Sequence, residues 1–183
     1  GVFEGTNTDW IGFEESIKWQ EENNASKIEQ KETALVVGYG GAAKAIIYSL
    51  SKLGFKKIRV FNRNFSKIQK LKNIIPHKLN EFENYFKEGN LVINTIPINY
   101  NDLKLKIPKT NSTKENQAHT PHGIDICYNK NTFFLEYFNS KKRFYGYHML
   151  AHQAAPCFNK WFGIRPEVDA GLVSLLKKKL AIK

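Results

Sequence analysis

Three small residues in the segment LVVGYGGAAKAIIYSL, residues 35–50, have a spacing suited to binding phosphate. They are Gly38, Gly40 and Ala43, in the pattern G-x-G-x-x-A. The first glycine allows a sharp turn, the second lets the backbone approach a pyrophosphate, and the alanine lets a helix pack closely on a strand. A helix beginning here points free N–H groups and its positive dipole end at the phosphates. The pattern predicts a dinucleotide site, and a tight strand-to-helix turn without a ligand is the alternative.

The end of the next expected strand distinguishes between the two nicotinamide dinucleotides. Proteins that bind NAD place Asp or Glu about 20 residues further on, where it bonds the ribose 2′-hydroxyl. Here the segment RVFNRNFSK contains no acid, and Asn62 and Arg63 stand in that place, with Lys67 shortly after. Because Arg63 can hold a 2′-phosphate through charge-assisted hydrogen bonds, the sequence favours NADP. The alternative is that Arg63 is a solvated surface charge.

Short apolar runs alternating with helix-forming segments must position these residues. Strands are expected at 34–37, 58–61, 91–95 and 124–127. Because helices are expected between several of them, the pattern predicts an α/β fold of the Rossmann type, with a doubly wound parallel sheet.

The expected helices come from apolar spacing and capping residues. One covers 13–22, a second 42–53, and a third is capped by Ser66 and ended by Pro76. The polar segment 99–122 is expected to be a long loop. From Met149 onward we expect two helices and no strand, in a segment of different character.

Composition limits the classes of partner. The net charge of +11 is compatible with nucleic-acid binding or with a lysine-rich surface that attracts an anionic cofactor. No helix-turn-helix, zinc or RNA-binding signature accompanies the charge, so no nucleic-acid partner is expected. No apolar run approaches the roughly 18 residues of a membrane span, and the polar start is no signal peptide. We therefore expect no membrane partner.

Two further features concern the origin of the chain. The cysteines, Cys127 and Cys157, are too few for a disulfide framework, and we expect small buried side chains in a reducing, cytoplasmic compartment. The single methionine is Met149, so Gly1 is expected to be a trimmed or proteolytic start.

Along nearly its whole length the sequence resembles the shikimate dehydrogenase family. The motif N-T-D-x-x-G-F appears at 7–13, G-x-G-G-A at 38–42, and N-R-x at 62–64. VINTIPI is similar to the family's I-N-x-T-P run, and GIDICYNKNTFFL to D-x-x-Y-x-P-x-x-T-x-L. MLAHQAAPCFNKWFG is similar to M-L-x-x-Q-A-A-x-x-F-x-x-W-x-G. These motifs in one order are more specific than any of them alone.

The resemblance implies reduction of 3-dehydroshikimate to shikimate with NADPH. It makes Asp9 a catalytic and substrate-binding carboxylate, and places Tyr128 and Gln153 in the substrate cleft. The lysine that acts with Asp9 in the family would lie in an upstream substrate domain, so this chain alone is expected to be inactive. From the residues alone, Asp9 could equally be a helix N-cap, Tyr128 a core aromatic and Gln153 an exposed helix residue.

The turn, the strand ends and the resemblance together assign the cofactor site. Its predicted residues are Gly38, Tyr39, Gly40, Gly41, Ala42, Asn62, Arg63, Asn64, Lys67, Asn94, Thr95, Ile126, His148 and Met149. His148 departs from the family, which usually has glycine there. His148 and His152 could share a helix face, but no third ligand is apparent, so no metal is expected.

The resemblance also implies a division of the chain. Residues 1–147 would form the NADP-binding domain, and 148–183 would be helices that return to the substrate domain. Those helices would leave an apolar face uncovered, so a homodimer is expected. The alternatives are a quinate/shikimate dehydrogenase of broader substrate use, another NADP-linked dehydrogenase, or a nucleotide-binding regulatory module without turnover.

Overall fold

A six-stranded parallel sheet forms the centre of the molecule. The computed structural model describes residues 5–23, 26–103, 120–129 and 132–180. The strands are β1 (Thr33–Val37), β2 (Lys57–Asn62), β3 (Ile74–Lys78), β4 (Leu91–Asn94), β5 (His122–Asp125) and β6 (Arg143–Tyr145). Their order is β3-β2-β1-β4-β5-β6, and every pairing is parallel. This order is that of a Rossmann fold, with its switch point between β1 and β4. The predicted fold class is confirmed.

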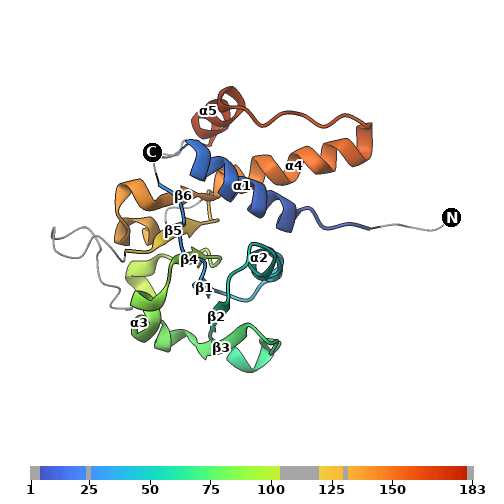
Figure 1. The fold of residues 1–183 in the computed structure, drawn as a ribbon. Coiled ribbons are helices and arrows are strands. Elements are labelled where there is room, and N and C mark those ends of the chain that lie inside the picture. Colours follow the sequence, from blue (N-terminus) through green and yellow to red (C-terminus); the bar gives the residue numbers. More distant parts are fainter. Residues whose placement is uncertain (1–4, 24–25, 104–119, 130–131, 181–183) are drawn as a thin grey trace.

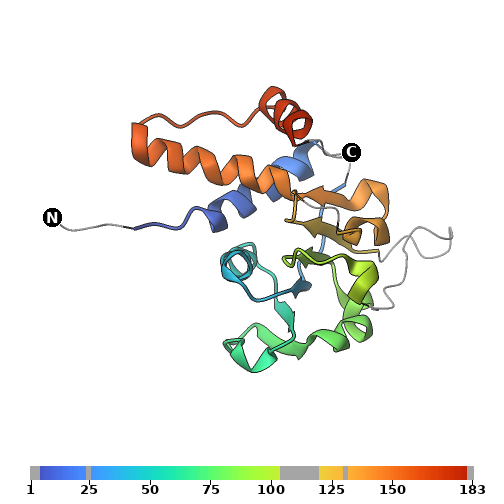
Figure 2. The ribbon, with the colours of Figure 1, turned by 180° about the vertical axis from the view of Figure 1, so that it is seen from behind.

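Helices cover the sheet on both faces. They are α1 (Asp9–Asn23), α2 (Gly41–Lys52), α3 (Phe82–Tyr85), α4 (Gly146–Phe162) and α5 (Ala170–Lys179). α2 and α3 lie on opposite sides of the strands, whereas α1 and α4 pack together at the β5–β6 end (Figure 1). In the reverse view α5 again lies beyond α4, on the side away from the sheet (Figure 2). No helix in the described ranges is long and apolar enough to cross a membrane.

The core is divided into two layers by the alternation of strand β1. Successive side chains of a strand point to opposite faces, so a strand buried on both sides is apolar throughout. Ala34 and Val36 belong to the cluster that contains α1 and α2 residues, whereas Leu35 and Val37 belong to the cluster with α3. All four are fully buried. This two-sided burial explains the unbroken apolar run before Gly38.

The prediction of a helix between Ser66 and Pro76 is wrong. Only a 3-10 turn, η1 (Phe65–Lys67), forms there, and Pro76 lies inside strand β3. Proline cannot donate a ladder hydrogen bond, but an edge strand tolerates it because one side has no neighbour. β3 is such an edge and pairs only with β2. The predicted strand list also lacked β3 and β6.

Two glycines let α4 approach its neighbours at backbone distance. A Cβ atom on Gly12 of α1 would lie 2.5 Å from Cβ of Gln153 in α4. A Cβ atom on Gly146, where α4 begins, would lie 2.5 Å from the carbonyl oxygen of Asp125, the last residue of β5. Both contacts are too short for any side chain. Helix α4 is therefore held against α1 and against the end of the sheet.

Candidate active site and dinucleotide site

The turn after β1 requires glycine at position 38. Gly38 has φ +106°, a region that favours glycine, and its N–H donates to Phe61 O at 2.8 Å. A Cβ atom there would also collide with Oγ1 of Thr95. Thr95 Oγ1 in turn donates to Val37 O at 2.7 Å. The residues that follow β1, β2 and β4 are thus fixed to one another at the C-terminal edge of the sheet.

The N-terminus of α2 is open to solvent. Gly40 is its N-cap and contributes no side chain, and Gly41 is the first helical residue. A Cβ atom on either glycine would meet nothing within 4 Å. Ala43, by contrast, is completely buried against the sheet. Unpartnered first-turn N–H groups with free space before them are what a phosphate group needs.

The end of β2 presents cationic side chains beside this turn. Arg63 and Lys67 are exposed, and neither has an ion-pair partner among the residues described. The amide of Asn62 donates to Asn64 O at 3.0 Å, which fixes the backbone of the turn. Tyr39 Oη accepts the N–H of Gln69 at 3.0 Å, so the glycine turn is tied to the segment after η1. The arrangement leaves the guanidinium of Arg63 available to an anion.

A buried polar network stands behind the ends of β4 and β5. The side-chain amide of Asn94 donates to Asp125 Oδ1 at 2.9 Å and to Ile96 O at 3.1 Å. Its oxygen accepts the Ile96 N–H and the hydroxyl of Tyr100, both at 3.0 Å. Asn94 is fully buried, so its side chain is occupied inside the protein. Its contribution to the edge of the sheet is to hold the backbone at Ile96.

Asp125 completes this network. Its carboxylate accepts the N–H of Cys127 at 2.9 Å and the hydroxyl of Thr132. Burial raises the pKa of the Asp125 carboxyl above its usual value, while these hydrogen bonds oppose the shift. Burial also raises the pKa of Tyr100. Sequence reasoning missed Asp125, Tyr100 and Thr132, although an acid at the end of an apolar strand is a signal of a buried polar role.

The predicted catalytic and substrate residues lie on α1 and α4 or follow β5. Asp9 is the first residue of α1, and its N–H donates to Asn7 Oδ1 at 2.8 Å. The alternative role of Asp9 as the N-cap is therefore wrong. Asp9 and Gly12 are three residues apart and share a helix face, and Gly12 touches Gln153. The helix crossing thus brings Asp9 toward Gln153.

Asp9 and Tyr128 are both partly accessible. The side chain of Asp9 forms no hydrogen bond or ion pair within the described part of the chain, and the residue is half-buried. Tyr128 is also half-buried, and its N–H donates to Ile126 O at 3.1 Å. An unpaired carboxylate at a helix start is available to a substrate or to a cation.

His148 and Met149 are buried, as are Gly38 and Asn94 among the predicted cofactor residues. The ring of His148 lies 4.7 Å from the Trp19 ring and 4.4 Å from the Tyr147 ring, between centroids. Burial lowers the pKa of His148 to about 4, with a smaller effect of His152. The imidazole therefore packs neutral against α1, and Met149 belongs to the core cluster on the α1–α2 side of the sheet. Ile126 is half-buried beside Gly146.

Substitutions of Asp125 should show whether its hydrogen bonds or its shape stabilise the buried network. Asp125→Leu removes the acceptor from one N–H of the Asn94 amide, from the N–H of Cys127 and from the hydroxyl of Thr132, so we expect a loss of about 3 kcal/mol in unfolding free energy. Asp125→Asn keeps one acceptor oxygen and should cost about 1 kcal/mol or less. Urea unfolding at pH 7 measures both. Equal losses for the two variants would contradict this role.

Comparison with known proteins agrees with this geometry. Residues 21–128 match the family model described as shikimate / quinate 5-dehydrogenase. A shikimate dehydrogenase (NADP(+)) of Bartonella tribocorum is 32% identical over 175 residues, covering 91% of this chain and 59% of that relative. The chain therefore spans less than two thirds of such a relative.

Solved structures support the same fold. A chorismate mutase/shikimate 5-dehydrogenase fusion protein from Clostridium acetobutylicum has a TM-score of 0.70 at 27% identity, over 96% of this chain and 63% of that one. A quinate dehydrogenase from Corynebacterium glutamicum in complex with NAD has a TM-score of 0.69 at 19% identity, over 97% of this chain and 62% of that one. By its matching family model, its sequence relatives and its strand order, this chain belongs to the shikimate dehydrogenase family.

Proposed function

We propose that this chain supplies the cofactor half of an NADP-dependent dehydrogenase that interconverts 3-dehydroshikimate and shikimate. The observation that carries the proposal is the open N-terminus of α2 at Gly40 and Gly41, together with the guanidinium of Arg63, which has no ion-pair partner among the described residues. The Bartonella tribocorum relative is named a shikimate dehydrogenase (NADP(+)), and this supports the choice of cofactor. The dinucleotide, when bound, would supply or accept the hydride.

Different predicted residues would bind different parts of the dinucleotide. The first N–H groups of α2 would hold the pyrophosphate, and Arg63 with Asn62, Asn64 and Lys67 would surround the 2′-phosphate. Thr95, Ile126 and the backbone at His148 and Met149 would line the nicotinamide end. We also propose the division into a dinucleotide domain, 1–147, and helices of a substrate domain, 148–183.

Arg63 should determine the preference between the two dinucleotides. We expect the 183-residue chain to bind NADPH at least about tenfold more tightly than NADH, because only NADPH carries the 2′-phosphate. Arg63→Ala should remove most of that difference and leave NADH binding unchanged. Lys87→Ala, an exposed cation outside the predicted site, is the control. Calorimetric titration gives the dissociation constants, and equal binding of NADPH and NADH by the unaltered chain would refute the assignment.

Asp9 would act at the reacting oxygen together with Gln153 and Tyr128. A carboxylate beside an ammonium group orients it and favours its charged form, so Asp9 would position the family's lysine and assist the proton transfer. Helix α1 would present Asp9 to the substrate, and the crossing at Gly12 would set its distance from Gln153.

Turnover tests this role in a polypeptide that also contains the substrate domain. Asp9→Asn should lower shikimate oxidation by about two orders of magnitude or more, whereas NADPH binding should not change. Glu14→Gln, on the same helix, is the control because the one ion-pair partner of Glu14 among the described residues is Lys18. Normal turnover in Asp9→Asn would exclude Asp9 from the reaction.

Two alternative functions differ in substrate or in turnover. A quinate/shikimate dehydrogenase would also oxidise quinate, and the fold likeness to a quinate dehydrogenase is compatible with that. A nucleotide-binding regulatory module would bind NADPH without any turnover, and the lack of a described cationic partner for Asp9 favours it. Assays with quinate and shikimate as paired substrates separate the three.

Self-association would cover the apolar end of α4. The exposed fractions of Trp161, Phe162 and Ile164 are 75%, 61% and 65%. Such a cluster is unusual on a monomer, so we propose a homodimer through this surface. Sedimentation should show a dimer that Trp161→Asp dissociates and that Leu71→Asp, at another exposed apolar residue, leaves intact. A clean monomer at high concentration would contradict the proposal.

The two cysteines give an argument about the cellular compartment of the protein. Neither Cys127 nor Cys157 forms a disulfide within the described part of the chain, both are partly buried, and Cys157 Sγ lies 3.0 Å from Thr8 Oγ1. Because free thiols persist in a reducing compartment, we propose a cytoplasmic location, which cell fractionation tests.

A further inference from the structure

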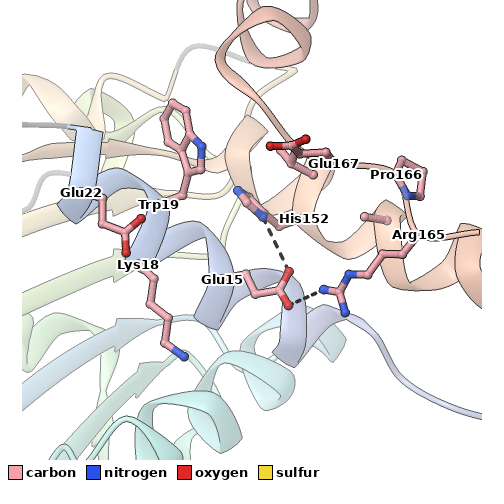
Figure 3. A pocket seen from close by; sticks show the side chains of 10 residues that line it. Glu15, Lys18, Trp19, Glu22, His152, Arg165, Pro166 and Glu167 are labelled. Carbon is pink, nitrogen blue, oxygen red and sulfur yellow. Dashed lines mark hydrogen bonds and ion pairs between the residues drawn. The ribbon is translucent and has the colours of Figure 1, made fainter.

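A pocket lies on α1, and its lining is separate from the predicted dinucleotide site. It has a volume of about 410 Å³ and is formed by α1, α4 and the segment that connects α4 to α5. Figure 3 shows Trp19, Glu15 and Glu167 around the imidazole of His152. None of the predicted cofactor or catalytic residues lines it. Its size suits a small organic molecule.

The cations of the pocket are already paired. Arg165 donates to Glu15 Oε1 at 2.5 Å, and Lys18 donates to Glu14 at 2.7 Å. Glu22 and Glu167, in contrast, have no hydrogen-bond or ion-pair partner in the described part of the chain. The pocket therefore contains uncompensated carboxylates in a protein whose net charge is +11. Its excess charge has the opposite sign to that of the chain as a whole.

His152 adds a third unsatisfied group. The residue is 7% exposed, and its buried Nε2 atom has no hydrogen-bond partner among the described residues. Its Nδ1 lies 3.7 Å from Glu15 Oε2, and a carboxylate at that side favours the tautomer with hydrogen on Nδ1. Burial lowers the pKa of His152, so the ring is neutral near pH 7 and Nε2 is an acceptor. A buried acceptor without a donor is costly, and a ligand can satisfy it.

The pocket wall also contains an aromatic side chain. Trp19 contributes its indole to the pocket wall, and an indole face attracts cations. The unpaired groups of this pocket are thus carboxylates, an imidazole acceptor and a π system. All of them complement a hydrogen-bond donor that carries positive charge.

We propose that this pocket binds a small organic cation with a primary ammonium or guanidinium group. The ammonium or guanidinium would lie between Glu22 and Glu167, donate toward His152, and place its apolar part against Trp19. The site is separate from the proposed dehydrogenase function and does not depend on it. A failure of NADPH binding would therefore leave this proposal standing, and the reverse also holds.

Ligands of one shape and different charge test the proposal. Benzylamine, benzyl alcohol and benzoate share a ring and differ in charge at one position. Titration of the 183-residue chain at pH 7 and low salt should give saturable binding of benzylamine and no measurable binding of benzoate. Benzyl alcohol should bind at least about fivefold more weakly than benzylamine, and salt should weaken the benzylamine complex. Phenylalanine, a zwitterion, should bind more weakly than benzylamine.

Matched variants locate the site. Glu22→Gln and Glu167→Gln should each weaken benzylamine binding roughly fivefold, since each removes one exposed carboxylate. Glu136→Gln removes an exposed carboxylate outside the pocket and should have no effect. Circular dichroism confirms that the variants fold. Absence of saturable benzylamine binding, equal binding of benzoate, or insensitivity to both pocket variants would each overturn the proposal.

Discussion

The close contact of α4 with both α1 and the end of β5 is the constraint on which the rest of the arrangement depends. Gly12 and Gly146 are the points of contact, and at each a Cβ atom would overlap its neighbour. Since protein interiors are packed at near-crystalline density, the two helices have little freedom to move apart or rotate while these contacts persist. Tyr145 N–H also donates to Gln20 Oε1 at 2.7 Å, which fixes the start of α4 against the last turn of α1.

The C-terminal edge of the sheet is also held in one arrangement where a dinucleotide would lie. Gly38, Thr95 and Asn94 connect three strand ends through hydrogen bonds of the backbone and side chains. The buried carboxylate of Asp125 is kept in place by several donors rather than by a countercharge. A fully satisfied polar network of this kind favours one arrangement of its loops, because any other leaves a buried group unpaired.

The sequence predicted the parts of the fold that local chemistry determines. Gly38, Gly40 and Ala43 identify the turn because each position has a separate steric reason, and the apolar run before them identifies β1. The segment after Ser66 was misassigned because its helix-forming residues outweighed the edge position of β3, which only the strand order reveals.

The direction in which individual side chains point could not be predicted from the sequence either. His148 stands beside predicted cofactor residues in sequence, yet its ring packs against Trp19. The partners of Asp125 come from distant segments, Asn94 and Thr132, so spacing alone could not identify the network. The predicted roles of Asp9, Gln153 and Arg63 are compatible with the fold. They remain predictions, because the fold alone does not test what these side chains bind.

Helix α1 connects the two candidate sites in a simple geometric way. Asp9, Gly12, Glu15, Trp19 and Glu22 follow one another along one side of the helix. Gly12 meets Gln153, and the later residues Glu15, Trp19 and Glu22 line the pocket. α4 likewise presents Gln153 and His152 from consecutive positions, which point in different directions on a helix. The charge distribution follows the same division. Within the described residues, cations without an ion-pair partner lie at the end of β2, where phosphate is expected, whereas carboxylates without a partner lie at Glu22 of α1 and at Glu167 between α4 and α5. A chain with net charge +11 attracts anions at long range, so a local excess of carboxylates is needed before any surface of it can hold a cation.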